Sequence, residues 1–288
     1  MIANLAGVLF DGIAYGSLLF LISIGLGVTL GLMNFINLAH GAFAMLGGYA
    51  CVMAMTRLGV PFLATLPIAF AVAALAGFVF ERALYQRLYA AHPLDQVLFS
   101  IGLVMIAMAA ATYFFGSSQQ PVALPAFLRG QVRVLGVDLG IYRLFLVAVV
   151  VVLAGALTFL LERTRFGARV RASVDNATAA AGLGIPVNRV FAVTFALGCG
   201  LAGLGGALGI DVLGLDPSFP LKYMVYFLLV VAVGGAGTFK GSIVAALILG
   251  IFDVAGKYYV PQVGAFIIYG LMVVLLVLFP RGLYGRRA

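Results

Sequence analysis

The sequence NFINLAHG occupies residues 34–41 and separates two apolar segments, residues 5–33 and 42–56. Two asparagines, a histidine and a glycine therefore stand where the chain is expected to cross lipid. Amide and imidazole groups without partners are costly to place in hydrocarbon. Irregular polar backbone is found at membrane depth only where protein encloses it or where it lines a path. We interpret the stretch as a helix break that either lines a path through the membrane or forms a hydrogen-bonded kink.

The composition indicates a polytopic α-helical membrane protein. Of the 288 residues, 64% are hydrophobic and 9% are charged, whereas soluble domains are about half apolar and about 25% charged. The apolar runs are continuous and do not alternate with polar residues, which argues against a β-barrel. We predict an all-α fold in which residues 1–288 form one transmembrane domain.

Several apolar segments are shorter than the length of about 20 residues that a full crossing needs. Short segments in both halves of a chain are typical of transport sites. We expect eight or nine transmembrane or re-entrant segments. The apolar segments are residues 5–33, 42–56, 61–80, 96–115, 142–161, 190–210, 222–233, 242–255 and 264–279.

The formal net charge of +8 comes mostly from short basic clusters between apolar segments. This distribution is typical of the positive-inside rule, and we exclude nucleic-acid binding. The clusters within residues 82–87, 163–189 and 281–287 are expected in the cytoplasm, and the C-terminus with them. The linkers 116–141 and 211–221 are then expected outside, and counting crossings backward places the N-terminus outside too.

The cytoplasmic linker 162–189 contains its own helix signal. Asn176 can cap a short helix over residues 177–181, and Gly182 or Gly184 can end it. A connecting loop would not need this helix, whereas a docking element for a cytoplasmic partner would.

The break at residues 34–41 supplies the candidate pathway residues. Asn37 can cap a helix that begins at Leu38, with His40 in its first turn. The free N–H groups and positive dipole end of such a helix favour an anionic group, such as an amino-acid carboxylate. Asn34 and Asn37 can share one face. We predict that Asn34, Asn37, His40 and Gly41 line or shape the path, the alternative being a purely structural break.

Two glycine-rich patterns favour packing over ligand binding. Residues 234–242 (GGAGTFKGS) differ from a phosphate-binding loop because the Lys precedes its Gly and no strand leads in. We expect a sharp turn between membrane segments there. The pairs Gly27/Gly31 and Gly205/Gly209 have GxxxG spacing and predict close helix packing.

The sequence does not point to an enzyme. It has two histidines without zinc-site spacing and lacks a GxSxG motif, and Cys51 and Cys199 are expected to be buried thiols. We expect no catalytic residue, metal or cofactor.

Acidic residues near the apolar segments are few, namely Asp11, Asp95 and Asp253, and only Asp253 has a nearby basic partner, Lys257. Carriers driven by protons or sodium usually bury carboxylates along the route. We therefore expect the energy source in another chain. The competing hypotheses are a stand-alone carrier or channel and a structural or signalling subunit.

Four long runs resemble the H-type permease subunit of branched-chain amino acid ABC importers. They are GIAYGSLLFLISIGLGVTLGLMNFINLAHGAFAMLGGY, ERTRFGARVRASVDNATAAAGLGIPVNRVFAVTFALGCGLAGLGGALG, LVVAVGGAGTFKGSIVAALILG and FPRGLYGRR, in the family's order. The resemblance implies a multi-pass protein of the bacterial inner membrane. It also implies a second, M-type permease, two cytoplasmic ATPases and an extracytoplasmic binding protein as partners. Sister permeases carry urea, short amides or aromatic acids, so these solutes remain alternatives.

The resemblance also implies that the segment from about residue 162 to 185 contacts the ATPases. Thr178 stands where the family often has Glu, so a salt bridge from that position is not expected here. The coupling residues implied are Glu162, Arg163, Arg165, Gly167, Arg171, Asn176, Ala179, Ala180 and Gly184.

Overall fold

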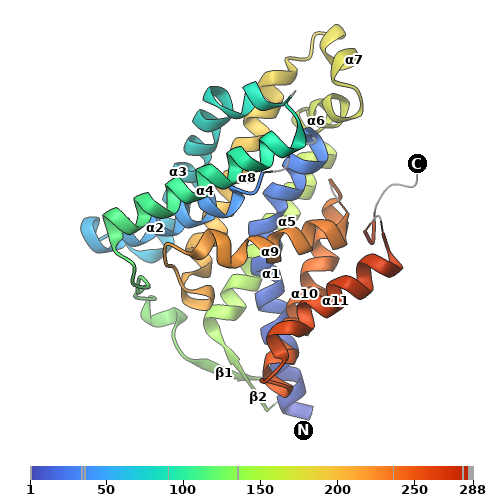
Figure 1. Cartoon of the computed structure of the whole chain (residues 1–288). Helices are drawn as coiled ribbons and strands as arrows, with labels where there is room; N and C mark the ends of the chain where they lie inside the picture. The colour runs from blue at the N-terminus through green and yellow to red at the C-terminus, as the bar shows by residue number, and fades with distance from the viewer. Residues whose placement is uncertain are drawn as a thin grey trace.

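The computed structural model describes residues 2–33, 35, 37–89, 91–134, 136–235, 237–280 and 282–284 (Figure 1). In chain order the elements are α1 (Ile2–Met33), α2 (His40–Leu58), α3 (Phe62–Ala83), the 3-10 turn η1 (Tyr85–Leu88), α4 (Pro93–Phe115), the 3-10 turn η2 (Ala126–Leu128), β1 (Gln131–Val134), β2 (Val137–Gly140), α5 (Ile141–Arg163), α6 (Arg165–Asp175), α7 (Ala177–Gly182), α8 (Val187–Leu213), α9 (Phe219–Gly234), α10 (Phe239–Tyr259) and α11 (Gly264–Leu278).

The predicted helical membrane fold is confirmed. Within the described residues, seven helices are long and apolar enough to cross a membrane, and these are α1 to α5, α8 and α10. The helix α9 and the apolar part of α11, Phe266–Leu278, are shorter. Together these nine helices correspond to the nine apolar segments of the sequence, because continuous hydropathy marks each of them.

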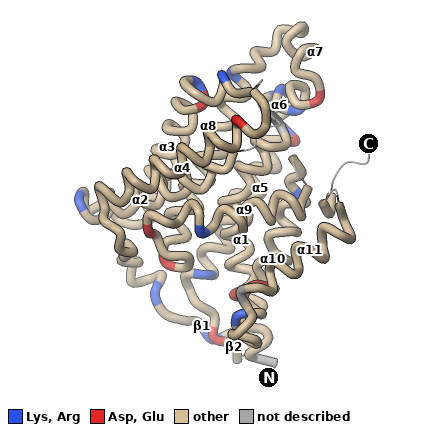
Figure 2. Tube along the Cα trace, in the orientation of Figure 1, with Lys and Arg blue, Asp and Glu red and all other residues tan. Residues whose placement is uncertain are grey.

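The linker before α5 contains a small antiparallel hairpin that the sequence did not predict. Strands β1 and β2 pair with Gln131 opposite Gly140, and Arg133 and Asp138 form an exposed ion pair of 3.2 Å. The hairpin lies near the N-terminus, and α6 and α7 lie at the opposite end (Figure 1). Charged residues gather mostly at these two ends (Figure 2), as expected for a bundle whose middle contacts lipid.

Helix α8 lies at the centre of the bundle and packs against α1, α2 and α3. Its glycines allow backbone to touch backbone. Gly203 faces Gly47 of α2, and a Cβ on Gly206 would lie 1.9 Å from the carbonyl oxygen of Ala44. In the predicted GxxxG pair, a Cβ on Gly205 would lie 2.5 Å from the Ile22 side chain of α1, whereas one on Gly209 would lie 3.4 Å from Leu18. The close packing predicted there is confirmed at Gly205, and the backbone contacts with α2 come from Gly203 and Gly206 instead.

The segment between α9 and α10 is the sharp turn that the sequence predicted. Gly235 and Gly237 have φ angles of 93° and 76°, a region that glycine adopts without strain. The Gly237 N–H donates to the carbonyl of Gly27 in α1 over 3.2 Å, and Gly31 lies against Gly237. The small residues late in α1 thus let this turn approach the helix closely.

Replacing Gly206 by Ala should destabilise the protein by about 1–3 kcal/mol, because the new methyl group overlaps the Ala44 carbonyl and forces α2 and α8 apart. Gly102→Ala in α4 is the matched control, since a Cβ there meets no atom within 4 Å. Thermal unfolding of the purified proteins in detergent measures the difference. Equal melting temperatures for the two variants would contradict the assignment of α8 as the tightly packed centre.

Candidate functional site

The polar break joins the end of α1 to the beginning of α2 beside the middle of α1. The Nε2 atom of His40, the first residue of α2, lies 2.8 Å from the carbonyl oxygen of Ile22. Ile22 lies within the apolar part of α1, well before its end at Met33. The chain therefore turns back along α1 after Met33, and α2 begins at membrane depth.

Asn37 organises this turn without capping α2. Its Oδ1 atom accepts hydrogen bonds from the Ala39 N–H, at 3.1 Å, and from the Tyr85 hydroxyl, at 3.0 Å. Helix α2 begins at His40, and its N-cap residue Ala39 offers no side-chain acceptor. The predicted cap by Asn37 of a helix starting at Leu38 was therefore wrong, because Asn37 bonds within the turn and to a distant tyrosine.

Aromatic rings enclose the break. The ring of Tyr85 contacts those of Phe35, Phe99 and Phe195, with ring centroids 5.1, 5.3 and 4.9 Å apart. Burial raises the pKa of the Tyr85 phenol well above its usual value, so the hydroxyl stays protonated and acts as the donor to Asn37. The residues that surround the break come from η1, α4 and α8, far apart in the sequence.

The other predicted pathway residues differ in what they contact. Asn37 and His40 are 0% and 1% exposed, and Asn37 Nδ2 and His40 Nδ1 have no hydrogen-bond partner among the described residues. A Cβ on Gly41 would lie 3.0 Å from the Cα of Pro220, so this glycine lets the start of α9 approach α2. Asn34 lies outside the described residues.

Two apolar cavities follow directly on the break. One, of about 350 Å³, lies between α2 and α4 and includes Ala42, Phe43 and Leu103 in its wall. The second, of about 460 Å³, continues along α2 past Tyr49, which also lines the first. The α2 residues that follow the break thus form one wall of two neighbouring apolar cavities, which together are called the apolar groove along α2.

The predicted coupling segment, residues 162–185, contains two helices, α6 and α7, of which the sequence predicted one. The unpredicted helix α6 begins with a cap by the Thr164 hydroxyl, which accepts from the Gly167 N–H at 3.2 Å. A Cβ on Gly167 would overlap the Leu161 carbonyl, and Arg171 Nη1 donates to the same oxygen. Glu162, Arg163 and Arg165 are exposed around this junction. Gly167 and Arg171 therefore set the angle between α5 and α6.

The predicted short helix is confirmed as α7. Asn176 Oδ1 accepts from the Ala179 N–H at 2.9 Å, and Gly184, just past the helix, has a φ of 81°. Ala180 is buried, whereas Ala179 is exposed. The predicted coupling residues thus form two adjacent groups, one at the α5–α6 junction and one on α7, which projects from the end of the molecule (Figure 1).

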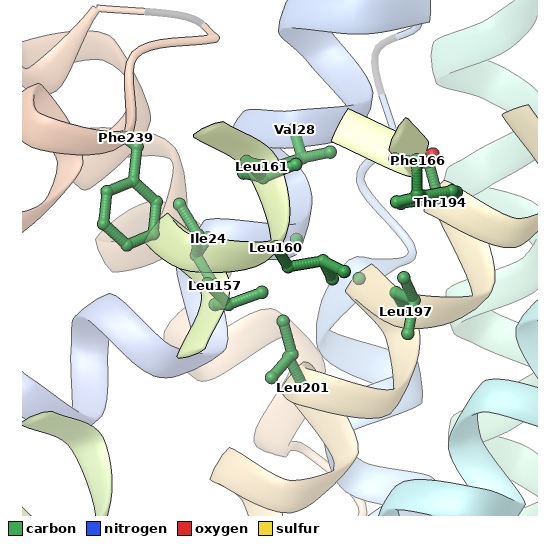
Figure 3. Close-up of a pocket in the computed structure, with 12 residues that line it drawn as sticks. Ile24, Val28, Leu157, Leu160, Leu161, Phe166, Thr194, Leu197, Leu201 and Phe239 are labelled. Atoms are coloured by element: carbon green, nitrogen blue, oxygen red, sulfur yellow. The ribbon is translucent and has the colours of Figure 1, made fainter. Parts of the chain in front are cut away.

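Helix α6 contacts the transmembrane helices through Phe166. This ring lines a small apolar cavity with Ile24 and Val28 of α1, Leu160 of α5 and Leu197 of α8 (Figure 3). The cavity measures about 30 Å³, room for only about one water. Movement of α6 would therefore be transmitted to α1, α5 and α8 by direct contact.

Sequence reasoning missed Tyr85, Phe166, Glu81 and Leu183. Tyr85 lies 48 residues from Asn37, so no local pattern could pair them. Glu81 is buried and accepts from the Tyr89 hydroxyl at 2.7 Å, although it stands in a basic cluster that suggested an exposed linker. Leu183 is 82% exposed beside Gly184, just past the end of the projecting helix α7.

Comparison with known proteins assigns the family. Residues 8–277 match the family described as branched-chain amino acid transport system / permease component. The chain belongs to this permease family. No solved structure matches it significantly.

The permease is also similar to curated proteins over nearly its whole length. It is 27% identical to the high-affinity branched-chain amino acid transport system permease protein BraD of Pseudomonas aeruginosa, over 96% of this chain and 95% of BraD. It is 27% identical to LivH of Escherichia coli K12, over 96% and 94% of the two chains. A probable LivH of Methanocaldococcus jannaschii is 28% identical, over 96% and 92%.

Replacing Tyr85 by Phe should destabilise the permease by about 1 kcal/mol, because the buried Asn37 oxygen loses one of its two donors. The matched control is Tyr113→Phe, since Tyr113 is 83% exposed. Thermal unfolding in detergent tests this expectation. If Tyr85→Phe has the same melting temperature as Tyr113→Phe and the wild type, the hydrogen bond between Tyr85 and Asn37 does not stabilise the break.

Proposed function

We propose that this permease is a subunit of an ATP-driven importer of branched-chain amino acids and forms part of its translocation path. The proposal rests on one observation, the polar helix break at membrane depth in a chain of the permease family. The hydrogen bond between His40 and Ile22 holds this break in place. The relatives named above carry branched-chain amino acid transport in their names, and the groove along α2 has apolar walls that suit branched aliphatic side chains.

Within this proposal, Asn37, His40 and Gly41 shape the route. They hold the start of α2, and the α2 residues that follow form a wall of the apolar groove. Asn34 is proposed as a fourth member of this group on its place in the sequence alone. The solute itself would pass along the groove face rather than through the packed interior around Tyr85.

The energy for transport would come from two cytoplasmic ATPases. They would contact the exposed residues Glu162, Arg163 and Arg165 and the projecting helix α7, with Leu183 entering a pocket of the partner. A push on α7 and α6 would reach the transmembrane helices through Phe166 and rock them as rigid bodies. A second, M-type permease and an extracytoplasmic binding protein would complete the importer.

In this proposal the permease lies in the bacterial inner membrane, and its C-terminus faces the cytoplasm. The Leu283 N–H donates to the Val233 carbonyl at 2.7 Å, beside the turn that bonds to Gly27. Val28, the next residue of α1, lines the cavity that also contains Phe166 of α6. Residues 282–284 therefore lie near the predicted coupling helices, which supports a common cytoplasmic side for both.

Replacing His40 by Ala should lower leucine uptake several-fold in proteoliposomes that contain the complete importer. The start of α2 loses its contact with α1, at a cost of about 1–3 kcal/mol for the buried hydrogen bond. Asn37→Ala should act in the same direction. His92→Ala, which changes the other, exposed histidine, is the control. If His40→Ala and Asn37→Ala take up leucine at the wild-type rate in normally assembled complexes, these residues do not shape the translocation path.

The same assay distinguishes the alternative solutes and mechanisms. Uptake of urea, a short amide or an aromatic acid in place of leucine, isoleucine and valine would assign the permease to a different substrate class. Ion-driven uptake by the purified chain, without ATPases, would favour a stand-alone carrier.

Replacing Gly184 by Val should uncouple ATP hydrolysis from uptake or prevent assembly with the ATPases. A β-branched residue is strained at the Gly184 φ of 81°, so the end of α7 must change shape. Gly182→Val is the matched control, because its added Cβ also meets no atom and its φ is not positive. The ratio of leucine transported to ATP hydrolysed measures coupling. A normal ratio in an assembled Gly184→Val complex would exclude α7 as the docking element.

A further inference from the structure

A second polar site lies at the end of the molecule opposite to α6 and α7. A cavity of about 220 Å³ opens between α1, α5, α8 and α10, and its charged lining residues are Asp11, Arg143, Asp253 and Lys257. Acidic and basic positions stand close together around β2 and the neighbouring end of α10 (Figure 2). None of these residues belongs to the break or to the coupling segment.

The pocket contains two acidic and two basic side chains, but one carboxylate oxygen among them lacks a hydrogen-bond donor. Arg143 pairs with Asp11, and Lys257 Nζ lies 2.5 Å from Asp253 Oδ2. Asp253 is 1% exposed, and its second oxygen, Oδ1, has no partner among the described residues. An unpartnered buried carboxylate oxygen is costly, so Asp253 Oδ1 at the wall of this cavity has the capacity to accept one more donor.

The cations of the pocket also retain free capacity. The Lys257 ammonium lies 5.8 Å from the ring centroids of Tyr15 and Tyr226, a position that attracts a cation without using its N–H donors. The guanidinium of Arg143 has five N–H donors, more than a single carboxylate such as Asp11 can engage. The pocket therefore offers a free acceptor on one side and free donors on the other.

We propose that this pocket binds the ammonium and carboxylate groups of a zwitterionic amino acid at the outer end of the route. The ammonium would donate to Asp253 Oδ1, and the carboxylate would accept from Arg143 and Lys257. This inference rests on the proposed function. It deepens that function by assigning recognition of the main-chain groups of the solute to one site. Neutral solutes such as urea lack both charges.

The same chemistry could come from the headgroup of phosphatidylethanolamine, which also carries an ammonium and an anion. A structural ion-pair cluster with water in the cavity, in contrast, would bind neither of these molecules. The experiment therefore has to separate a soluble zwitterion from a lipid headgroup and from an empty cluster.

Cysteine protection provides this separation. The native Cys51 and Cys199 are buried, so a single cysteine introduced at Val254, in the wall of the pocket, reports its accessibility to a membrane-impermeant thiol reagent. The complete importer is used in nanodiscs of phosphatidylcholine and phosphatidylglycerol. Val132→Cys on the exposed strand β1 is the matched control.

Leucine should slow the labelling of Val254→Cys about ten-fold or more at saturation, because a bound solute covers the thiol and free sites become rare. It should leave Val132→Cys unaffected. Leucinol, which lacks the carboxylate, and 4-methylpentanoate, which lacks the ammonium, should not protect. Asp253→Asn should abolish protection, whereas Asp138→Asn, which breaks the exposed pair with Arg133, should retain it.

Each contrary outcome has a distinct meaning. No protection by leucine, in an importer that takes up leucine, overturns this inference and leaves the proposed function intact. Equal protection by leucinol or 4-methylpentanoate overturns the zwitterion assignment. Protection that appears only when phosphatidylethanolamine is added to the nanodiscs assigns the pocket to lipid and also overturns it. An importer that takes up no branched-chain amino acid, by contrast, refutes the proposed function itself.

Discussion

Polar groups at membrane depth must find partners inside the protein, and this requirement shapes the centre of the permease. The helix break between α1 and α2 exposes backbone and side-chain groups that lipid cannot satisfy. The imidazole of His40 meets the Ile22 carbonyl, and the amide oxygen of Asn37 receives donors from Ala39 and Tyr85. These bonds bring α2 and the segment after α3 against the middle of α1. The position of the apolar groove follows from them, because its wall begins where the break ends.

The helix packing around the break also depends on glycine residues. Helix α8 approaches both α1 and α2 closely. Gly198 meets Gly25 of α1, and Gly203 and Gly206 meet Gly47 and Ala44 of α2. Helices in lipid gain little from apolar burial against one another, so close van der Waals contact provides much of their affinity. The tightly packed α8 therefore forms a rigid centre, around which α4, α5 and α11 are more exposed to the surroundings of the bundle.

The break, helix α6 and the proposed outer pocket around Asp253 meet on α1. Asp11 lines the outer pocket, Ile22 accepts from His40, and Val28 shares a small cavity with Phe166 of α6. One helix thus contacts the break, α6 and this pocket. Since packed interiors move between discrete arrangements rather than deforming gradually, a rigid displacement of α1 relative to α8 is a physical route by which a cytoplasmic push could reach the outer pocket.

The sequence by itself determined the features that depend on neighbouring residues. Continuous hydropathy predicted the nine apolar helices, and the Asn176 cap, the glycine turn before α10 and the Asp253–Lys257 pair followed from short spacings. Only the tertiary structure decided which distant groups meet. Tyr85 donates a hydrogen bond to Asn37, and Arg143 forms an ion pair with Asp11. Glu81 is buried despite its basic neighbours. These contacts depend on helix crossings that spacing along the chain does not encode, because an interhelical partner is set by the packing of whole helices and not by local propensity.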